Sequence, residues 1–277
     1  MFKFTVSVLW MFFAVSCLWA ADKPIRPVQI VVPASQHISP KEGTCEVWSM
    51  DTVDFNKELQ PENTDIMRYV TFFALNSKNN YKKGEKGKGD EIFITYGKST
   101  QGEIQSVVFR TNLGRQDNGS PGIATLHNGK IKIKADSWHF YAVTWRVANG
   151  KVFVKMYVDG KKCHEKELKY KKNMLPSSLR NYVIMIGGFP KSLSTLESLR
   201  ISSKEHSEQE IKKAAASALK PAKDTLLFLD GAAMKSLKKH QGAFYHGDNV
   251  AKDGELYGEI KLLNGKHGKA LRLFSEK

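Results

Sequence analysis

The chain has 277 residues, of which 41% are hydrophobic, so it is long and apolar enough to form a packed core and is not wholly disordered. Its formal net charge of +15 suits acidic partners such as sulfated or uronic polysaccharides, anionic lipid surfaces or nucleic acid. The alternative explanation is that lysines keep a β protein soluble and protect its edge strands.

The N-terminus has the pattern of an export signal. An uncharged stretch from Phe4 to Ala21 follows Lys3 and ends in small residues. This pattern predicts a secretory signal peptide over residues 1–21, with an uncleaved anchor or lipid attachment at Cys17 as alternatives. No later apolar stretch approaches spanning length. We therefore expect a secreted, periplasmic or cell-surface protein without a transmembrane segment after cleavage.

Short apolar segments recur along the chain, separated by turn signals at intervals of about ten residues. Residues 50–65 and 81–89 are polar or rich in lysine and glycine and predict loops, and residues 119–122 predict a turn. This spacing favours a β-sandwich over alternating strands and helices. The predicted strands before residue 138 are 28–32, 44–49, 66–75, 92–96, 104–110 and 131–134.

Residues 138–160 predict the centre of the fold, two long antiparallel strands joined at Asn149-Gly150. A second turn at Asp159-Gly160 reverses the chain again. The second strand alternates strictly, so one of its faces is expected to be buried. The two sets of alternating side chains are Val152, Val154, Met156 and Val158 on one face, and Lys151, Phe153, Lys155 and Tyr157 on the other.

One helix is predicted near residues 207–220. Ser207 and Glu210 have the spacing of a capping box, residues 214–218 favour helix, and Pro221 is expected to end it.

Four stretches of the sequence, in chain order, resemble laminin-G-like jelly rolls, which belong to the concanavalin A-like lectin/glucanase fold. In the order of the family, the resemblance extends over residues 27–215. It implies an all-β, antiparallel two-sheet jelly-roll sandwich over residues 22–220. The stretches are Glu-Gly-Thr-Cys-Glu-Val-Trp at 42–48, the strand pair at 138–160, Ile-Met-Ile-Gly-Gly at 184–188, and Leu-Glu-Ser-Leu-Arg-Ile at 196–201 followed by Glu210-Ile211.

The C-terminal segment, residues 221–277, contains two further matches. Residues 225–231 and 265–274 resemble the opening strands of a laminin-G-like domain, which are missing ahead of Val28. Either the segment folds back as in a circular permutant, or it begins a second domain that stops early. An unpartnered strand at residues 226–229 would expose an apolar edge. We therefore predict that the segment folds back onto the sandwich.

Two cysteines, Cys45 and Cys163, remain after removal of the signal peptide, and each lies in a different predicted strand. In an oxidising compartment they could form a disulfide. The sequence leaves open whether they pair or stay as free buried thiols, because it does not give the distance between their Cα atoms.

Residues suited to catalysis are not evident in the sequence. Polysaccharide hydrolases of the resembled fold carry Glu-x-Asp-x-x-Glu on one strand, whereas here no Glu is followed two residues later by Asp. The nearest same-face pair, Glu165 and Glu167, lies among lysines, and the histidines lack metal-ligand spacing. Loops at 116–119 and 248–249 match no calcium-ligand pattern. We expect no enzyme activity, no catalytic or metal-binding residues, and no cofactor; calcium has no supporting motif.

The strongest candidate for a binding surface is the face formed by Lys151, Phe153, Lys155 and Tyr157. Aromatic rings stack on sugars and lysines neutralise sulfate or carboxylate, so this face predicts an acidic or sulfated glycan as partner and no specific nucleic acid. The alternative is that Phe153 and Tyr157 pack beneath a loop or beneath the C-terminal segment. The sequence thus favours a binding or adhesion module for carbohydrate or cell-surface glycan. Two alternatives are an accessory or degenerate glycoside-hydrolase-type domain and a structural surface protein.

Overall fold

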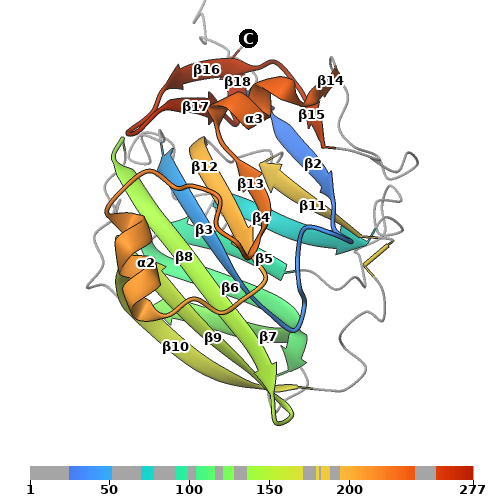
Figure 1. Cartoon of the computed structure of the whole chain (residues 1–277), viewed down its shortest axis with the longest axis vertical. Coiled ribbons are helices and arrows are strands. Elements are labelled where there is room, and N and C mark those ends of the chain that lie inside the picture. Colours follow the sequence, from blue (N-terminus) through green and yellow to red (C-terminus); the bar gives the residue numbers. More distant parts are fainter. Residues whose placement is uncertain are drawn as a thin grey trace, which may run out of the picture.

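The protein is an antiparallel β-sandwich of the jelly-roll class with few helices (Figure 1). A computed structural model describes residues 25–51, 70–77, 92–98, 104–115, 121–127, 136–170, 179–180, 182–187, 194–240 and 254–276. The predicted signal peptide, the strand at 131–134 and the loops at 81–89, 116–119 and 248–249 lie outside these residues. The fold class is the one that the sequence predicts.

The front layer contains the predicted central strands, and their turns are confirmed. Asn149 and Gly150 have φ angles of 52° and 71°, and Asp159 and Gly160 have 50° and 76°. Such positive values are those of tight hairpin turns. The strands follow the order β10 (Lys161–Tyr170), β9 (Lys151–Val158), β8 (Trp138–Ala148), β3 (Glu42–Asp51) and β12 (Ser194–Ser202).

The back layer joins the front layer where β10 pairs with β6 over a few residues. One of its strands, β7, was not predicted: the expected turn at 119–122 overlaps its first residues. Pro121 fits there because a proline at the first position of a strand removes no necessary hydrogen bond. The layer contains β15 (Glu255–Tyr257), β2 (Gln29–Pro33), β11 (Tyr182–Gly187), β4 (Val70–Ser77), β5 (Ile92–Lys98), β6 (Ile104–Arg115) and β7 (Pro121–His127).

The C-terminal residues supply strands to both layers. In front, β12 pairs with β13 (Thr225–Leu229) and with β17 (Lys269–Arg272), which continues to β16 (Lys261–Asn264). At the back, β15 pairs with β2 and, in parallel, with β14 (Lys238–His240). The short helix α3 (Gly231–Ser236) follows β13, and β18 (Phe274–Glu276) pairs with β1 (Ile25–Pro27). That the sandwich depends on this segment stays a prediction.

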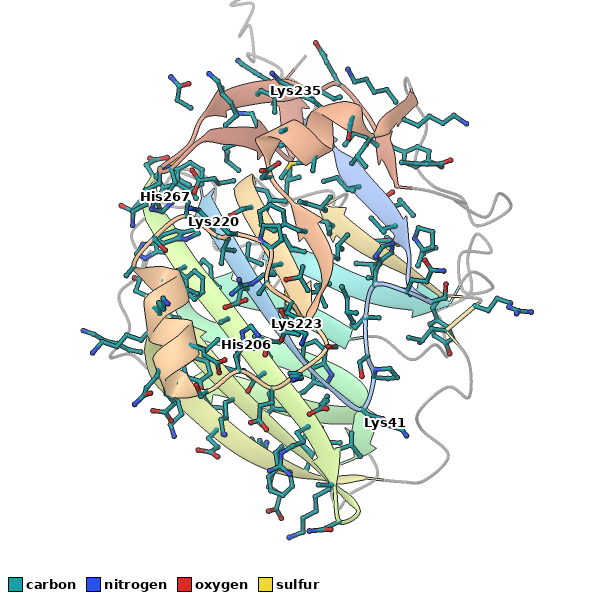
Figure 2. All side chains as sticks on the ribbon, in the orientation of Figure 1. Lys41, His206, Lys220, Lys223, Lys235 and His267 are labelled. Carbon is teal, nitrogen blue, oxygen red and sulfur yellow. The ribbon has the colours of Figure 1, made fainter. Side chains whose placement is uncertain are left out.

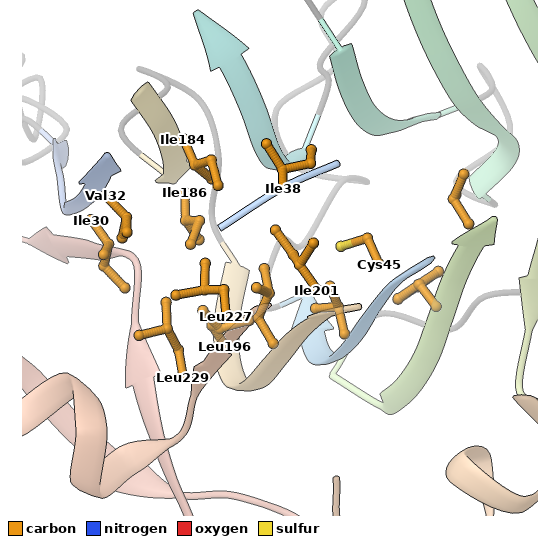
Figure 3. Packing of buried hydrophobic residues seen from close by; sticks show 14 of the residues in the cluster. Ile30, Val32, Ile38, Cys45, Ile184, Ile186, Leu196, Ile201, Leu227 and Leu229 are labelled. Carbon is orange, nitrogen blue, oxygen red and sulfur yellow. The ribbon is translucent and has the colours of Figure 1, made fainter. Parts of the chain in front are cut away.

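The core lies between the two layers and is built from their inward-facing side chains (Figure 3). The valines of β9 face this core as predicted, together with Met156. Trp145 of β8 is fully buried there, and its Nε1–H donates to the Ser39 carbonyl at 3.0 Å. Leu227 and Leu229 of β13 pack into the same cluster, so the C-terminal segment contributes directly to the core.

Cys45 and Cys163 are free thiols. Strands β8 and β9 lie between β3, which carries Cys45, and β10, which carries Cys163. Three strand spacings place the two residues about 14 Å apart. A disulfide needs Cα atoms within about 7 Å, so this arrangement does not permit the bond. Cys163 instead donates its thiol hydrogen to the Met156 carbonyl.

The predicted helix is α2 (Glu208–Ala215), with Ser207 as its N-cap. The capping box is confirmed: Glu210 N–H donates to Ser207 Oγ at 3.3 Å, and Ser207 N–H to Glu210 Oε2 at 2.7 Å. The helix ends at Ala215, earlier than Pro221 predicted. The chain leaves the helix there because residues 216–220 turn inward and bury Leu219 against the sheet.

Candidate functional site

A single segment crosses the front layer on the side away from the core, which we call the outer face. We call residues 203–224 the strap; it contains α2 and the chain on either side of it, and Figure 1 shows it in front of β8 and β3. Trp48, Phe140 and Tyr157 of the outer face are buried beneath Ile211 and Leu219 of the strap. The strap therefore covers an aromatic part of this sheet.

Beside the strap lies an open cleft of about 270 Å³. It forms where β12, the N-terminus of α3 and the turn between β16 and β17 meet the strap. The residues that line it are Glu197, Ser198, Ala218, Leu219, Asp230, Gly231, Ala232, His267, Gly268 and Lys269.

Glu197 is the buried carboxylate of the cleft, with 4% of its surface exposed. The register of β12 against β3 shifts between Leu196 and Ser198, so Glu197 is the extra residue of a β-bulge. Such a bulge re-aims a side chain out of the normal alternation. Oε1 accepts from the backbone N–H groups of His267 and Gly268, and Oε2 accepts from His267 Nδ1 at 3.0 Å.

The turn around this carboxylate needs a glycine. A Cβ atom added at Gly265 would collide with the carboxylate of Glu197, which would then have to move. Gly265 N–H donates to the Gly268 carbonyl at 2.7 Å and closes the turn. Glu197 thus holds both the turn and the imidazole of His267. Because Nδ1 donates to the carboxylate, Nε2 is the ring nitrogen left for another partner.

Two lysines without a carboxylate partner among the described residues flank the cleft. Lys266 Nζ lies 3.9 Å from the ring centroid of Trp48, a cation–π contact, and the His267 ring meets the same indole edge-on at 4.8 Å. Lys220 follows the cleft-lining Leu219, and Figure 2 shows Lys220 and His267 close together on one face. The rim of the cleft is therefore basic.

The predicted binding residues Lys151, Phe153, Lys155 and Tyr157 all lie on the outer face of β9, but the structure does not leave all of them open. Tyr157 is 1% exposed and lies under the strap. Lys155 pairs with Glu205 at 2.9 Å, Lys151 pairs with Glu167, and Phe153 lies under the Arg146 guanidinium. For Tyr157 the structure has the alternative arrangement, packing beneath a covering segment. Glycan binding by this patch stays a prediction.

A buried ionic network anchors the strap to the sheet. Glu46 is fully buried and accepts from Arg200 Nε at 2.6 Å and Nη2 at 2.8 Å. His206 lies between Glu46 and Asp224, with Nε2 2.9 Å from Asp224 Oδ2. Burial alone would lower the pKa of His206, but the hydrogen bonds and charges of these two carboxylates outweigh it and raise the pKa above its ordinary value.

Among the residues that the structure describes, no cluster of three or more His, Cys, Asp or Glu side chains is placed to hold a metal ion. None of the helices in the described part of the chain is long and apolar enough to cross a membrane.

No protein-family profile matches the chain, and no curated protein matches it. Among solved structures it is similar to a heptameric SAP-like pentraxin from Limulus polyphemus, at 12% identity and a TM-score of 0.37 over 74% of this chain and 93% of that one. It is also similar to the IT-sialidase CBM40 of Ruminococcus gnavus bound to alpha2,3-sialyllactose, at 11% identity and a TM-score of 0.42 over 66% and 85%.

A third similar structure is the endo-1,3-beta-glucanase from Streptomyces sioyaensis, at 12% identity and a TM-score of 0.34 over 58% of this chain and 60% of that one. TM-scores this low support no conclusion about function. The strand pairings themselves define the class, an antiparallel two-layer jelly-roll sandwich.

Proposed function

We propose that this protein is a secreted, non-catalytic binding or adhesion module of the laminin-G-like type, and that it binds an acidic or sulfated glycan in the cleft. The observation that carries the proposal is the His267 imidazole, which the buried Glu197 holds at the cleft wall beside the basic groups of Lys266 and Lys220. The ammonium groups of the two lysines suit the sulfate or carboxylate groups of an anionic saccharide, and the imidazole offers its Nε2 to a sugar hydroxyl.

The wall of the cleft also has the mixed character that a sugar needs. Ala218, Leu219 and Ala232 offer apolar surface for the C–H face of a ring, while His267 and Lys269 offer polar groups. Small-molecule sites typically combine an apolar lining with a few placed polar groups. The volume of about 270 Å³ suits a ligand the size of one or two sugar units, bound as part of a longer chain.

A second candidate, a degenerate or accessory glycoside-hydrolase-type domain, is favoured by one observation: the carboxylates of Glu197 and Asp230 both line the cleft. Glycoside hydrolysis uses two such groups. Glu197, however, accepts three hydrogen bonds from the β16–β17 turn, and Asp230 Oδ1 accepts from the N–H groups of Ala232 and Ala233 at the start of α3. Both carboxylates already accept hydrogen bonds from backbone N–H groups, which supports a binding role over a role in hydrolysis.

A glycan array on the protein without residues 1–21, run beside an assay for released reducing ends, tests the proposal. We expect binding to sulfated or uronic glycans and no released sugar. The cleft is then tested on a heparin column: Lys220→Ala with Lys266→Ala should elute at lower salt, whereas Lys41→Ala, at the other end of the face in Figure 2, should elute as wild type.

The same heparin column shows whether the cleft or the β9 patch is the binding surface. If Lys151→Ala with Lys155→Ala abolishes retention and the cleft variant does not, the binding surface is the patch. An array without any acidic glycan bound would reject the proposal, and release of reducing ends would favour the hydrolase-type alternative.

A further inference from the structure

The outer face beneath the strap contains buried polar atoms that the strap leaves without partners. They are Thr144 Oγ1, Tyr157 OH and Ser202 Oγ. Thr144 and Ser202 are fully inaccessible, and Tyr157 is 1% exposed. A buried hydroxyl without a hydrogen bond destabilises a fold, and such atoms are uncommon in well-packed proteins. Three such hydroxyls lie on this one face of the sheet, and other buried polar atoms without a partner lie elsewhere in the described residues.

The strand register shows that these groups belong to one continuous surface. Thr144 of β8 lies between Thr44 of β3 and Lys155 of β9, and Ser202 of β12 lies beside Thr44. Along the same strands, Trp48 lies beside Phe140, and the ring of Tyr157 packs in the cluster with both. Hydroxyl groups next to aromatic rings are the composition of a site for a polar, ring-shaped ligand, rather than of a sheet face meant to be covered permanently.

One limb of the strap separates this surface from the cleft. Ala218 and Leu219 line the cleft on one side, and Leu219 covers the aromatic cluster on the other. The hydrogen bonds that hold residues 216–220 to the sheet come from Trp48 Nε1 to the Ser217 carbonyl at 3.2 Å and from Arg200 Nη1 to the Lys220 carbonyl at 2.7 Å. The more extensive ionic contacts of the strap lie at its two ends, at Glu205, His206 and Asp224.

From these observations we infer that the strap is a displaceable cover, and that the outer face beneath it is a second binding surface continuous with the cleft. The inference rests on the proposed function. The cleft takes the first sugar units of an acidic saccharide; when the strap lifts, the aromatic and hydroxyl groups beneath it take the units that follow. The ligand is therefore a chain longer than the cleft can hold.

The first test needs no ligand. Thr144→Val removes an unpartnered hydroxyl at nearly constant shape, so we expect the melting temperature to rise by about 2–4 °C. The matched control is Thr44→Val. Thr44 Oγ1 donates to the Lys204 carbonyl at 2.7 Å and accepts from His206 N–H at 2.8 Å, so its loss should lower the melting temperature. A fall in Thr144→Val like that of the control would mean that the hydroxyl has a partner, and would overturn the inference.

The second test measures chain length. Calorimetry with a heparin-derived disaccharide and octasaccharide should show tighter binding of the octasaccharide by wild type. In Thr144→Val the ratio of octasaccharide to disaccharide affinity should fall about fivefold, as expected for loss of one hydrogen bond to the ligand. Hydrogen exchange of residues 216–220 should accelerate with the octasaccharide and not with the disaccharide.

The outcomes separate the two proposals. If neither saccharide binds, the proposed function fails and the inference with it. If the disaccharide binds, but octasaccharide affinity and strap exchange do not respond to chain length, the inference alone is wrong.

Discussion

His206 Nε2 lies 2.9 Å from Asp224 Oδ2, and this contact ties the beginning of the strap to its end. The backbone reinforces the same closure, because Ser203 N–H donates to the Asp224 carbonyl at 2.9 Å. His206 Nδ1 faces Glu46 Oε1 at 3.6 Å, so the imidazole also connects the strap to the sheet. The protonation state of one buried side chain thus affects how firmly the strap is held.

The first prediction is a pH dependence of stability. The pKa of His206 is raised in the folded protein, where Glu46 and Asp224 favour the charged ring despite its burial. A group with a raised folded pKa contributes stability that is fully present below its unfolded value, near pH 6.5, and is lost as pH rises through the folded value. Wild type should therefore exceed His206→Gln in melting temperature by more at pH 5.5 than at pH 8.5.

The comparison between the two proteins is necessary because carboxylates act in the opposite direction. The pKa values of Asp224 and Glu205 are lowered in the folded state despite their partial burial, since hydrogen bonds from His206 and from Lys155, respectively, favour the charged form. Their contributions are lost as pH falls. If the difference in melting temperature between wild type and His206→Gln instead widens with rising pH, His206 is not stabilised in its charged form by Glu46 and Asp224.

The second prediction concerns Glu197. Glu197→Ala leaves three donors of the β16–β17 turn without their acceptor, and should lower the free energy of unfolding by about 3 kcal/mol. Glu197→Gln keeps one acceptor oxygen and should cost less. Urea denaturation followed by circular dichroism measures both variants.

The matched control is Glu167→Ala on the exposed face of β10. Its carboxylate also pairs with a cation, Lys151, but both side chains are about half exposed. Surface pairs of this kind contribute less than about 1 kcal/mol. Equal losses in the two alanine variants would show that the carboxylate of Glu197 does not hold the turn.

The contrast between the hairpin and the cleft shows what the sequence could predict. Asn149-Gly150 and the alternation of Val152 to Val158 are local signals, because turn chemistry and strand period act over a few residues. Glu197 and His267 are separated by 70 positions and meet only because β17 pairs with β12. The spacing of residues along the sequence does not indicate that Glu197 and His267 are in contact. One signal was available: a single glutamate within an otherwise buried strand, Ser194–Ser202.

The strap is a second case in which tertiary contacts decided the outcome. The capping box correctly predicted where α2 begins, since it involves residues three positions apart. Its end was misplaced because Ala216 to Leu219 have helix-compatible side chains, while burial of Leu219 against Trp48 favours leaving the helix. Tyr157 is buried in the same cluster beneath the strap. The alternation of side chains along β9 correctly predicted that Tyr157 lies on the outer face. It could not predict that the strap covers this residue.

The third prediction is chemical inertness of Cys45 and Cys163 in the folded protein. Cys45 is fully buried, and burial raises the pKa of its thiol well above the usual range. Burial likewise raises the pKa of Cys163 to about 12. A thiolate is the reactive form, so a thiol-specific reagent should modify neither residue in the native protein at pH 8, and both after unfolding in denaturant without reductant. Loss of both signals in the unfolded, unreduced protein would indicate a disulfide.

The last prediction tests whether the sandwich depends on its C-terminal strands. Leu229 of β13 is 3% exposed and packs in the core between the layers, so Leu229→Ala should lower the free energy of unfolding by about 2–5 kcal/mol. Leu226→Ala, at a half-buried position of the same strand, is the matched control and should cost much less. Removal of residues 224–277 should lower the melting temperature sharply or prevent folding, because β12 would lose both β13 and β17 as partners. An unchanged melting temperature would mean that the stability of the sandwich does not depend on this segment.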